Sequence, residues 1–377
     1  MIRLNILLCC IVVMVLASCR EEFDPPTKSS AKNFLVVEGV LNVGGPTTIR
    51  ITRSFRLEDS ARLRGERNAN VSVEGKDNTT QLLSMTGDGI YTSPNLNLVI
   101  NNEYRLRIQT NNGKEYLSDY VIARQTPPID SIGWEKNNDG VQIYVNTSDP
   151  SNNTRYYKWD YDETWEINSY YQSLYKYQNG VVSPRSAAED VYICWKNAVN
   201  SSIKIGTSTR LQSDVISKAP LVFTPNGNDK FSVRYSIMVR QYALDKKAYE
   251  FYELMKTNTE SLGTIFDPQP TEITGNIRCV TDVTEPVIGF ITASTISEKR
   301  IFISRSQLGG WDFYQYCESV LVANHPDSIE LYFENGGFEP YGSDELPIGI
   351  ITGYFSSFPP CVDCVKRGGS TVRPAFW

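Results

Sequence analysis

Cysteine is the residue type whose spacing in this chain carries the most chemistry. Of the eight cysteines, Cys9 and Cys10 lie in a hydrophobic leader and Cys19 ends it. Thiols of an exported protein meet an oxidising compartment and favour disulfides. The motif Cys361-Val362-Asp363-Cys364 could instead be a redox pair or half of a zinc site, but the sequence around it lacks the pattern of a thioredoxin-like fold. The remaining disulfide candidates are Cys194, Cys279, Cys317, Cys361 and Cys364.

These five cysteines predict at least one structural disulfide that involves Cys361 or Cys364. The odd number leaves one free thiol or an intermolecular bond. The spacing does not determine which cysteine pairs with which, so the connectivity stays open.

A single histidine, His325, limits the available catalytic and metal-binding chemistry. Multi-histidine metal sites are excluded, and His325 is the one candidate base for a nucleophilic triad. It lies in Asn324-His325-Pro326-Asp327, a turn-rich stretch typical of a surface loop. The common phosphate-binding, dinucleotide-binding, acyl-transfer and zinc-protease motifs are absent from the sequence. We therefore predict no catalytic residue, no metal site and no cofactor, and a protein that is not an enzyme.

The N-terminus carries an export and lipidation signal. Arg3 precedes an apolar run over 6–17, which is too short to span a bilayer but fits the hydrophobic region of a signal peptide. The run ends in Leu16-Ala17-Ser18-Cys19, which resembles the bacterial lipobox, in which the cysteine receives a diacylglycerol thioether before cleavage. We predict a signal peptide over 1–18, acylation of Cys19, and a membrane anchor made by its acyl chains.

A short charged segment after this cysteine predicts where the protein is displayed. Arg20-Glu21-Glu22-Phe23-Asp24 resembles the acidic export signals that carry Bacteroidota lipoproteins to the cell surface. The alternative is a solvated charged linker. We expect a lipidated tether over 19–32, an outer-membrane location and display on the cell surface.

Composition places the chain among folded globular proteins. It has 377 residues, of which 41% are hydrophobic and 21% are charged, and these shares argue against disorder and against a multi-span membrane protein. The formal net charge of −6 provides no general basic surface, so we predict no nucleic-acid binding.

Short runs with period-two alternation predict a mainly β fold with two domains. Over 33–125, strands such as 34–40 and 48–53 are separated by turn residues, which is typical of an Ig-like or transthyretin-like β-sandwich. Pro127-Pro128 then favours an extended linker. The larger domain, 126–377, is β-rich with one or two helices, and Asp245 is placed to cap a helix that packs on its sheet.

Aromatic residues in the larger domain have two interpretations. Those on one face of the strand over 157–167 predict a buried core, with a carbohydrate platform as the alternative. Less regular tyrosines follow, and these are our candidates for ligand binding: Tyr170, Tyr171, Tyr175 and Tyr177.

Three serines lie in tripeptides that resemble the Bacteroidota O-glycosylation sequon, in which Asp precedes Ser or Thr and a small or aliphatic residue follows. The candidates are Ser60, Ser131 and Ser328. Ser60 and Ser328 lie in turn-prone surroundings where a glycan projects into water, whereas Ser131 follows the proline linker and can enter a strand.

Several segments, in their order along the chain, resemble the Bacteroidota outer-membrane lipoprotein family known as domain of unknown function 4249. The segments are Phe34-Leu35-Val36-Val37-Glu38-Gly39, Cys194-Trp195, Thr274-Gly275-Asn276-Ile277, residues 286–294, Cys361-Val362-Asp363-Cys364 and Arg373-Pro374-Ala375-Phe376-Trp377. The resemblance implies a non-enzymatic surface lipoprotein, commonly encoded beside TonB-dependent outer-membrane receptors. Two functions therefore compete: an accessory subunit of a TonB-dependent nutrient transporter, and a free-standing adhesion or glycan- or protein-binding module.

We expect Cys19→Ala to release the protein from the outer-membrane fraction, because the acyl chains provide its anchor. Cell fractionation together with labelling by a palmitate analogue measures this. A variant that stays membrane-bound and still incorporates the label contradicts the lipobox interpretation.

Protease shaving of intact cells tests surface display separately. We expect neutral replacement of Glu21 and Glu22 to reduce the accessibility of the protein to the protease.

Overall fold

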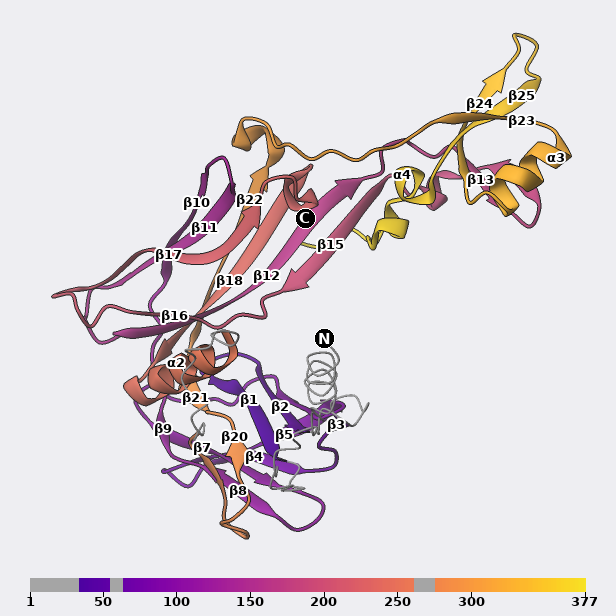
Figure 1. The fold of residues 1–377 in the computed structure, drawn as a ribbon. Helices are drawn as coiled ribbons and strands as arrows, with labels where there is room; N and C mark the ends of the chain where they lie inside the picture. The colour runs from indigo at the N-terminus through magenta and orange to yellow at the C-terminus, as the bar shows by residue number, and fades with distance from the viewer. Residues whose placement is uncertain (1–33, 55–63, 261–274) are drawn as a thin grey trace, which may run out of the picture. The chain divides into compact units, whose positions relative to one another are not determined.

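The computed structural model describes residues 34–54, 64–260 and 275–377, and these fold mainly as β-strands (Figure 1). The predicted mainly β class is therefore confirmed. Within the described ranges, none of the helices has the length and apolar character that a membrane crossing requires. The signal peptide, Cys19, the tether and Ser60 lie outside the described residues.

The N-terminal sheet forms because apolar residues alternate along its strands. In the hairpin of β1 and β2, Leu35 pairs with Arg53 and Val37 with Ile51, and the apolar members face one core. The strands of this sheet are β1 (Leu35–Asn42), β2 (Thr47–Arg53), β3 (Arg64–Gly65), β4 (Asn70–Gly75), β5 (Thr80–Gly87), β6 (Ile90–Ser93), β7 (Glu103–Gln109), β8 (Glu115–Ser118), β9 (Val121–Ile122), β19 (Ile277–Cys279), β20 (Val287–Ile288) and β21 (Thr292–Ser294).

The last three of these strands return to the sheet from far along the chain. β19 pairs antiparallel with β8, whereas β20 and β21 pair parallel with β1. Arg53 forms an ion pair with Glu285 at 2.8 Å, and the Tyr116 hydroxyl donates to the same carboxylate at 2.6 Å. The predicted domain over 33–125 does not include these strands, and residues Phe34–Trp377 form one compact unit.

The larger part of the chain is built on two sheets that share a core. Along β12, Tyr157, Trp159, Tyr161, Trp165 and Ile167 are at most 8% exposed, so the core interpretation is confirmed and the carbohydrate platform is wrong. One sheet contains β10 (Ile129–Lys136), β11 (Gly140–Asp149) and β17 (Asp214–Pro225). The other contains β12 (Tyr156–Asn168), β15 (Ile193–Val199), β16 (Lys204–Thr207), β18 (Arg234–Leu244) and β22 (Ile296–Ser304).

Helix α2 (Lys246–Glu260) follows β18. The Asp245 carboxylate accepts the Ala248 N–H at 2.7 Å, so the predicted cap is confirmed. On the apolar stripe, Phe251 packs with Phe290 and Leu244 in a small separate core. The helix therefore joins the end of β18 to the segment that connects β20 and β21.

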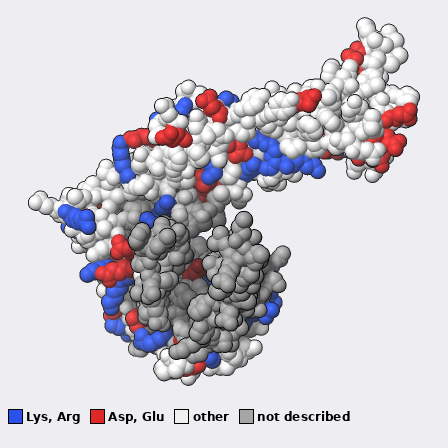
Figure 2. All heavy atoms as spheres, in the orientation of Figure 1, with Lys and Arg blue, Asp and Glu red and all other residues white. Residues whose placement is uncertain are grey.

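The elements β13, β14, β23, β24, β25, α3 and η4 form what we call the C-terminal lobe, whose core contains Val322, Phe333 and Tyr354. Figure 2 shows acidic side chains on this lobe. Its elements are β13 (Tyr175–Gln178), β14 (Val181–Pro184), β23 (Val320–Ala323), α3 (Pro326–Ile329), η4 (Glu330–Glu334), β24 (Glu339–Glu345) and β25 (Ile351–Ser357). The remaining short helices of the described chain are η1 (Ala187–Glu189), η2 (Asp229–Phe231), η3 (Arg305–Leu308), α4 (Pro359–Val362) and η5 (Cys364–Arg367).

Two disulfides connect the segment that contains Cys361 and Cys364 to earlier parts of the chain. Cys194 of β15 bonds Cys364, and Cys317 bonds Cys361 of α4. The two cysteines of the Cys361-Val362-Asp363-Cys364 motif are therefore bonded to other partners and not to each other. Cys279 carries a free, buried thiol.

The Cys194–Cys364 disulfide closes a sequence separation of 170 residues, and the Cys317–Cys361 disulfide closes 44. Chain entropy assigns about 5 kcal/mol to the first and about 4 kcal/mol to the second. We expect the Cys194→Ser/Cys364→Ser variant to lower the thermal unfolding midpoint more than the Cys317→Ser/Cys361→Ser variant. Differential scanning calorimetry measures this.

The matched control is Cys279→Ala, which leaves both disulfides in place. Non-reducing peptide mapping checks the pairing directly. A peptide in which Cys361 is linked to Cys364, or recovery of all five thiols in the free form, contradicts this connectivity.

Candidate functional site

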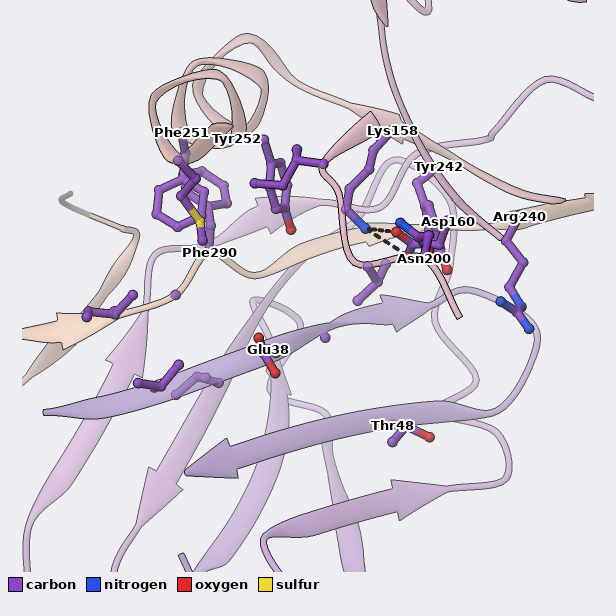
Figure 3. Close-up of a pocket in the computed structure, with 18 of the residues that line it drawn as sticks. Glu38, Thr48, Lys158, Asp160, Asn200, Arg240, Tyr242, Phe251, Tyr252 and Phe290 are labelled. Atoms are coloured by element: carbon purple, nitrogen blue, oxygen red, sulfur yellow. Dashed lines mark hydrogen bonds and ion pairs between the residues drawn. The ribbon is translucent and has the colours of Figure 1, made fainter. Parts of the chain in front are cut away.

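A cleft of about 610 Å³ lies where the N-terminal sheet meets β12, β18 and α2 (Figure 3). We call it the junction cleft. Its lining residues come from segments that are far apart in the sequence. They are Val36, Val37, Glu38, Gly39, Val40, Pro46, Thr48, Lys158, Asp160, Asn200, Ser201, Ser202, Ile203, Arg240, Tyr242, Phe251, Tyr252, Met255, Ile288, Gly289, Phe290 and Ile296.

The polar wall of the junction cleft follows from the alternation of β12. Because successive side chains of a strand point to opposite faces, burying Tyr157 and Trp159 places Lys158 and Asp160 on the other face. Lys158 pairs across the sheet with Tyr242 of β18, and Asp160 pairs with Arg240. The strand that builds the core thus also supplies charge to the cleft.

Lys158 is held rigidly in this wall. Its ammonium group donates to both carboxylate oxygens of Asp160, at 2.6 and 2.7 Å. The same nitrogen lies 5.0 Å from the ring centroid of Tyr242 and 5.4 Å from that of Tyr252, within the range of a cation–π contact. The ion pair and the two rings therefore form one ordered cluster.

Arg240 extends this cluster along β18. It forms ion pairs with Asp162 and, at 3.3 Å, with Glu298 of β22. Because its charge is already met by two carboxylates, Arg240 adds little net positive charge to the cleft.

Tyr252 and Glu38 face each other across the junction cleft. Figure 3 shows the Tyr252 hydroxyl, from α2, and the Glu38 carboxylate, from β1, pointing toward one another. Burial, followed by the charges of Asp160 and Glu38, raises the pKa of Tyr252 above its ordinary value. Glu38 is exposed. The centre of the cleft therefore offers a carboxylate acceptor and a phenolic hydroxyl.

A break in the edge pairing of β12 forms another part of the wall. β15 and β16 pair with the same edge of β12, and residues 200–203 lie between them. The Asn200 side chain accepts the Tyr161 N–H at 3.0 Å and donates to the Ser202 carbonyl at 2.9 Å. This side chain continues the pairing that the loop interrupts, so the loop has a defined conformation at the cleft.

The opposite wall requires a glycine. Gly289 has a φ of +151°, and a Cβ at this position would lie 2.2 Å from the Val37 carbonyl oxygen. This close approach lets residues 289–290 lie against β1 and positions Phe290 beside Phe251, with ring centroids 5.3 Å apart. These two rings form part of the apolar side of the cleft, together with aliphatic side chains such as that of Ile288.

The junction cleft has the features of a binding site. Among the described residues, no three metal-ligating side chains converge. His325 does not line the cleft; it lies at the start of α3, with Nδ1 3.6 Å from Asp327. The lining combines polar side chains, several of them fixed by hydrogen bonds, with aromatic and aliphatic surface, which suits recognition of a small ligand.

The four tyrosines that the sequence indicates lie outside the junction cleft. Tyr171 stacks on Tyr341 with ring centroids 4.1 Å apart, and Tyr175 and Tyr177 pack on the core of the C-terminal lobe. Tyr170 is 55% exposed and meets the ring of Tyr171 edge-on. The lobe thus uses most of these rings for its own packing.

The residues of the cleft that sequence reasoning missed are Glu38, Lys158, Asp160, Tyr242 and Tyr252. The alternation of β12 places Lys158 and Asp160 on the face opposite its aromatic residues. No local pattern indicates that this face lies opposite Glu38.

Two of the three predicted glycosylation sites can be located. Ser131 is exposed on β10 and accepts a hydrogen bond from the Asn146 amide at 2.9 Å. Ser328 is half-buried in α3. Glycosylation of these serines and of Ser60 stays a prediction.

Two solved structures illustrate a remote likeness to this chain. Domains FN1–FN3 of chicken CNTN1 match with a TM-score of 0.20 and 11% identity, covering 56% of this chain and 63% of that one. A Bacteroides uniformis protein for which carbohydrate binding has been suggested matches with a TM-score of 0.14 and 14% identity, covering 57% of this chain and 91% of that one. Scores this low carry no argument about fold or ligand.

A comparison with curated proteins returned no match. A family comparison did, and it agrees with the resemblance seen in the sequence. The family described as "Domain of unknown function (DUF4249)" matches residues 20–300, which is well over half of the chain, and the protein therefore belongs to this family.

Proposed function

We propose that this protein is a non-enzymatic, lipid-anchored binding protein of the outer membrane, displayed on the cell surface as an accessory subunit of a TonB-dependent nutrient transporter. The observation that carries the proposal is the junction cleft. Its volume of about 610 Å³ falls in the range of roughly 300–1,000 Å³ that small-ligand sites occupy. Hydrogen bonds and ion pairs hold several of its polar groups in place, among them Lys158, Asp160 and Asn200.

The lining of the cleft indicates the kind of ligand. Glu38 and the hydroxyl of Tyr252 converge from opposite walls, whereas Lys158 and Arg240 are already paired with carboxylates. A group that donates hydrogen bonds or carries positive charge fits between Glu38 and Tyr252. An apolar portion of the same ligand fits against the rings of Phe251 and Phe290.

The predicted anchor favours a partner in the same membrane. Between Cys19 and Phe34 the chain reaches roughly 50 Å at full extension. An acylated Cys19 would therefore keep the folded body close to the membrane surface, where transporters lie. The resemblance to a family commonly encoded beside TonB-dependent receptors supports the same partner.

We infer that the N-terminal sheet is an Ig-like or transthyretin-like module, because its strands alternate and its hairpins follow one another along the chain.

A free-standing adhesion or glycan- or protein-binding module is the second candidate. The observation that favours it is a set of exposed rings outside the junction cleft: Tyr314 is 81% exposed, Tyr316 69% and Tyr170 55%. Flat exposed rings can stack on sugars or on a protein surface.

The Glu38→Gln and Tyr252→Phe variants test the cleft. We expect native mass spectrometry of protein purified from its own host to detect a bound small ligand. In each variant, we expect the fraction of protein that carries this ligand to fall at least tenfold. The matched control is Glu135→Gln, because Glu135 is an exposed carboxylate on β10 that does not line the cleft. Equal ligand occupancy in Glu38→Gln and wild type contradicts the assignment.

Co-purification tests the transporter partner. We expect mild-detergent extraction and affinity purification of the lipidated protein to recover a TonB-dependent receptor in repeated preparations. The Cys19→Ala variant serves as the control, because a released protein meets the receptor less often. Repeated recovery of the protein without such a receptor favours the free-standing module.

A further inference from the structure

Charge is strongly segregated in the C-terminal part of this chain. Between Arg305 and Lys366 there is no Lys or Arg, although the chain average of 37 in 377 residues gives about six for a stretch of this length. The same stretch contains nine acidic residues, which are Asp312, Glu318, Asp327, Glu330, Glu334, Glu339, Asp344, Glu345 and Asp363. Most of these belong to the C-terminal lobe.

The turn between β24 and β25 places large aliphatic side chains in water. Leu346 is 47% exposed, Ile348 76% and Ile350 54%. The turn is well formed, since the Leu346 N–H donates to the Ile350 carbonyl at 2.9 Å and the Gly349 N–H donates to the Leu346 carbonyl at 2.8 Å. Adjacent exposed aliphatic residues on an ordered turn are typical of an interaction site. We call residues 346–350 the hairpin tip.

Two carboxylates lie at the base of the hairpin tip, both on β24. Asp344 and Glu345 end β24 directly before it. In the part of the chain that the structure describes, hydroxyl groups rather than cations contact them: Thr352 donates to Asp344 at 2.7 Å, and Ser343 donates to Glu345 at 2.6 Å. These bonds orient the carboxylates and leave their charge without a basic partner. We call this pair the acidic collar.

The tip is held by a rigid support. β25 lies between β23 and β24, and Val322 and Tyr354 pack in the core of the lobe. The Leu174 N–H donates to the Tyr341 carbonyl of β24 at 2.8 Å, which adds support from the segment before β13. Little conformational entropy would therefore be lost when the tip binds a partner.

We propose that the hairpin tip and its acidic collar form a docking surface for a protein partner that presents an apolar pocket rimmed by Lys and Arg. The apolar tip alone would suit either a lipid surface or a protein. The collar decides between them, because membrane surfaces with anionic headgroups attract basic residues and repel carboxylates. Complementary charge at the rim of a protein pocket would steer and align the tip.

This inference rests on the proposed function, because it assigns the surface through which an accessory subunit contacts its membrane partner. It uses none of the residues that line the junction cleft.

Site-specific photo-crosslinking in the native host tests the proposal with the full-length, lipidated protein. A benzophenone amino acid replaces Ile348, and the matched control places it at Leu82, which is 65% exposed on β5. We expect a discrete adduct with one outer-membrane protein from position 348 and none from position 82. Adding Asp344→Asn and Glu345→Gln, or raising NaCl to 0.5 M, should lower the adduct yield at least fivefold.

Other outcomes overturn the proposal. No adduct, an adduct with a second copy of this chain, or a yield unaffected by charge and salt contradicts a basic-rimmed protein pocket. Binding of the Cys19→Ala protein to phosphatidylethanolamine–phosphatidylglycerol vesicles, lost on Ile348→Ser, assigns the tip to lipid instead.

The test also separates this inference from the proposed function. A charge-dependent adduct with a protein other than a TonB-dependent receptor keeps the docking surface and contradicts the transporter role. A receptor that co-purifies unchanged with Ile348→Ser and Ile350→Ser keeps the transporter role and contradicts this docking surface.

Discussion

The pairing of β12 with β18 is the constraint on which the core and the junction cleft both depend. It runs without a break from Tyr156 opposite Leu244 to Glu166 opposite Arg234. Because side chains alternate between faces, a shift of one residue would bury charged groups and expose the aromatic core. The one carboxylate on the inner face, Glu163, is accommodated because the Lys230 ammonium and the Tyr235 hydroxyl both donate to it.

The outer face of the same strand connects the cleft to the C-terminus. Lys158 and Asp160 lie at the cleft end, and Glu166, near the other end, accepts a hydrogen bond from the Trp377 indole at 3.1 Å. Nearby, the guanidinium of Arg300 lies 3.5 Å from the ring centroid of Phe376. The aromatic end of the chain is thus packed on the sheet, and the Cys194–Cys364 disulfide holds the segment before it.

Strong local periodicity was predictable from the sequence, and long-range assembly was not. The buried face of β12 and the Asp245 cap follow from alternation and from capping chemistry, both of which act within a few residues. β20 has only two residues and pairs with a strand some 250 positions away, so no local pattern indicates it. For the same reason Glu38 could not be placed opposite Tyr252 before the fold was known. For Tyr170, Tyr171, Tyr175 and Tyr177 the sequence does not distinguish a small core from a binding platform, because both require the same rings, and ligand binding by these tyrosines stays a prediction.

The junction cleft and the hairpin tip are built from different strands. Under the proposed function, the ligand and the partner would therefore occupy separate surfaces and would not compete. The cleft is lined by the N-terminal sheet, β12, β18, α2 and the 200–203 loop, whereas the hairpin tip belongs to strands that contribute no residue to it. The charges follow the same division. Around the cleft, Lys158 and Arg240 are paired with carboxylates within the protein. The acidic collar, in contrast, has hydroxyl groups and no cation as its contacts in the described chain, so its charge would remain for the proposed partner.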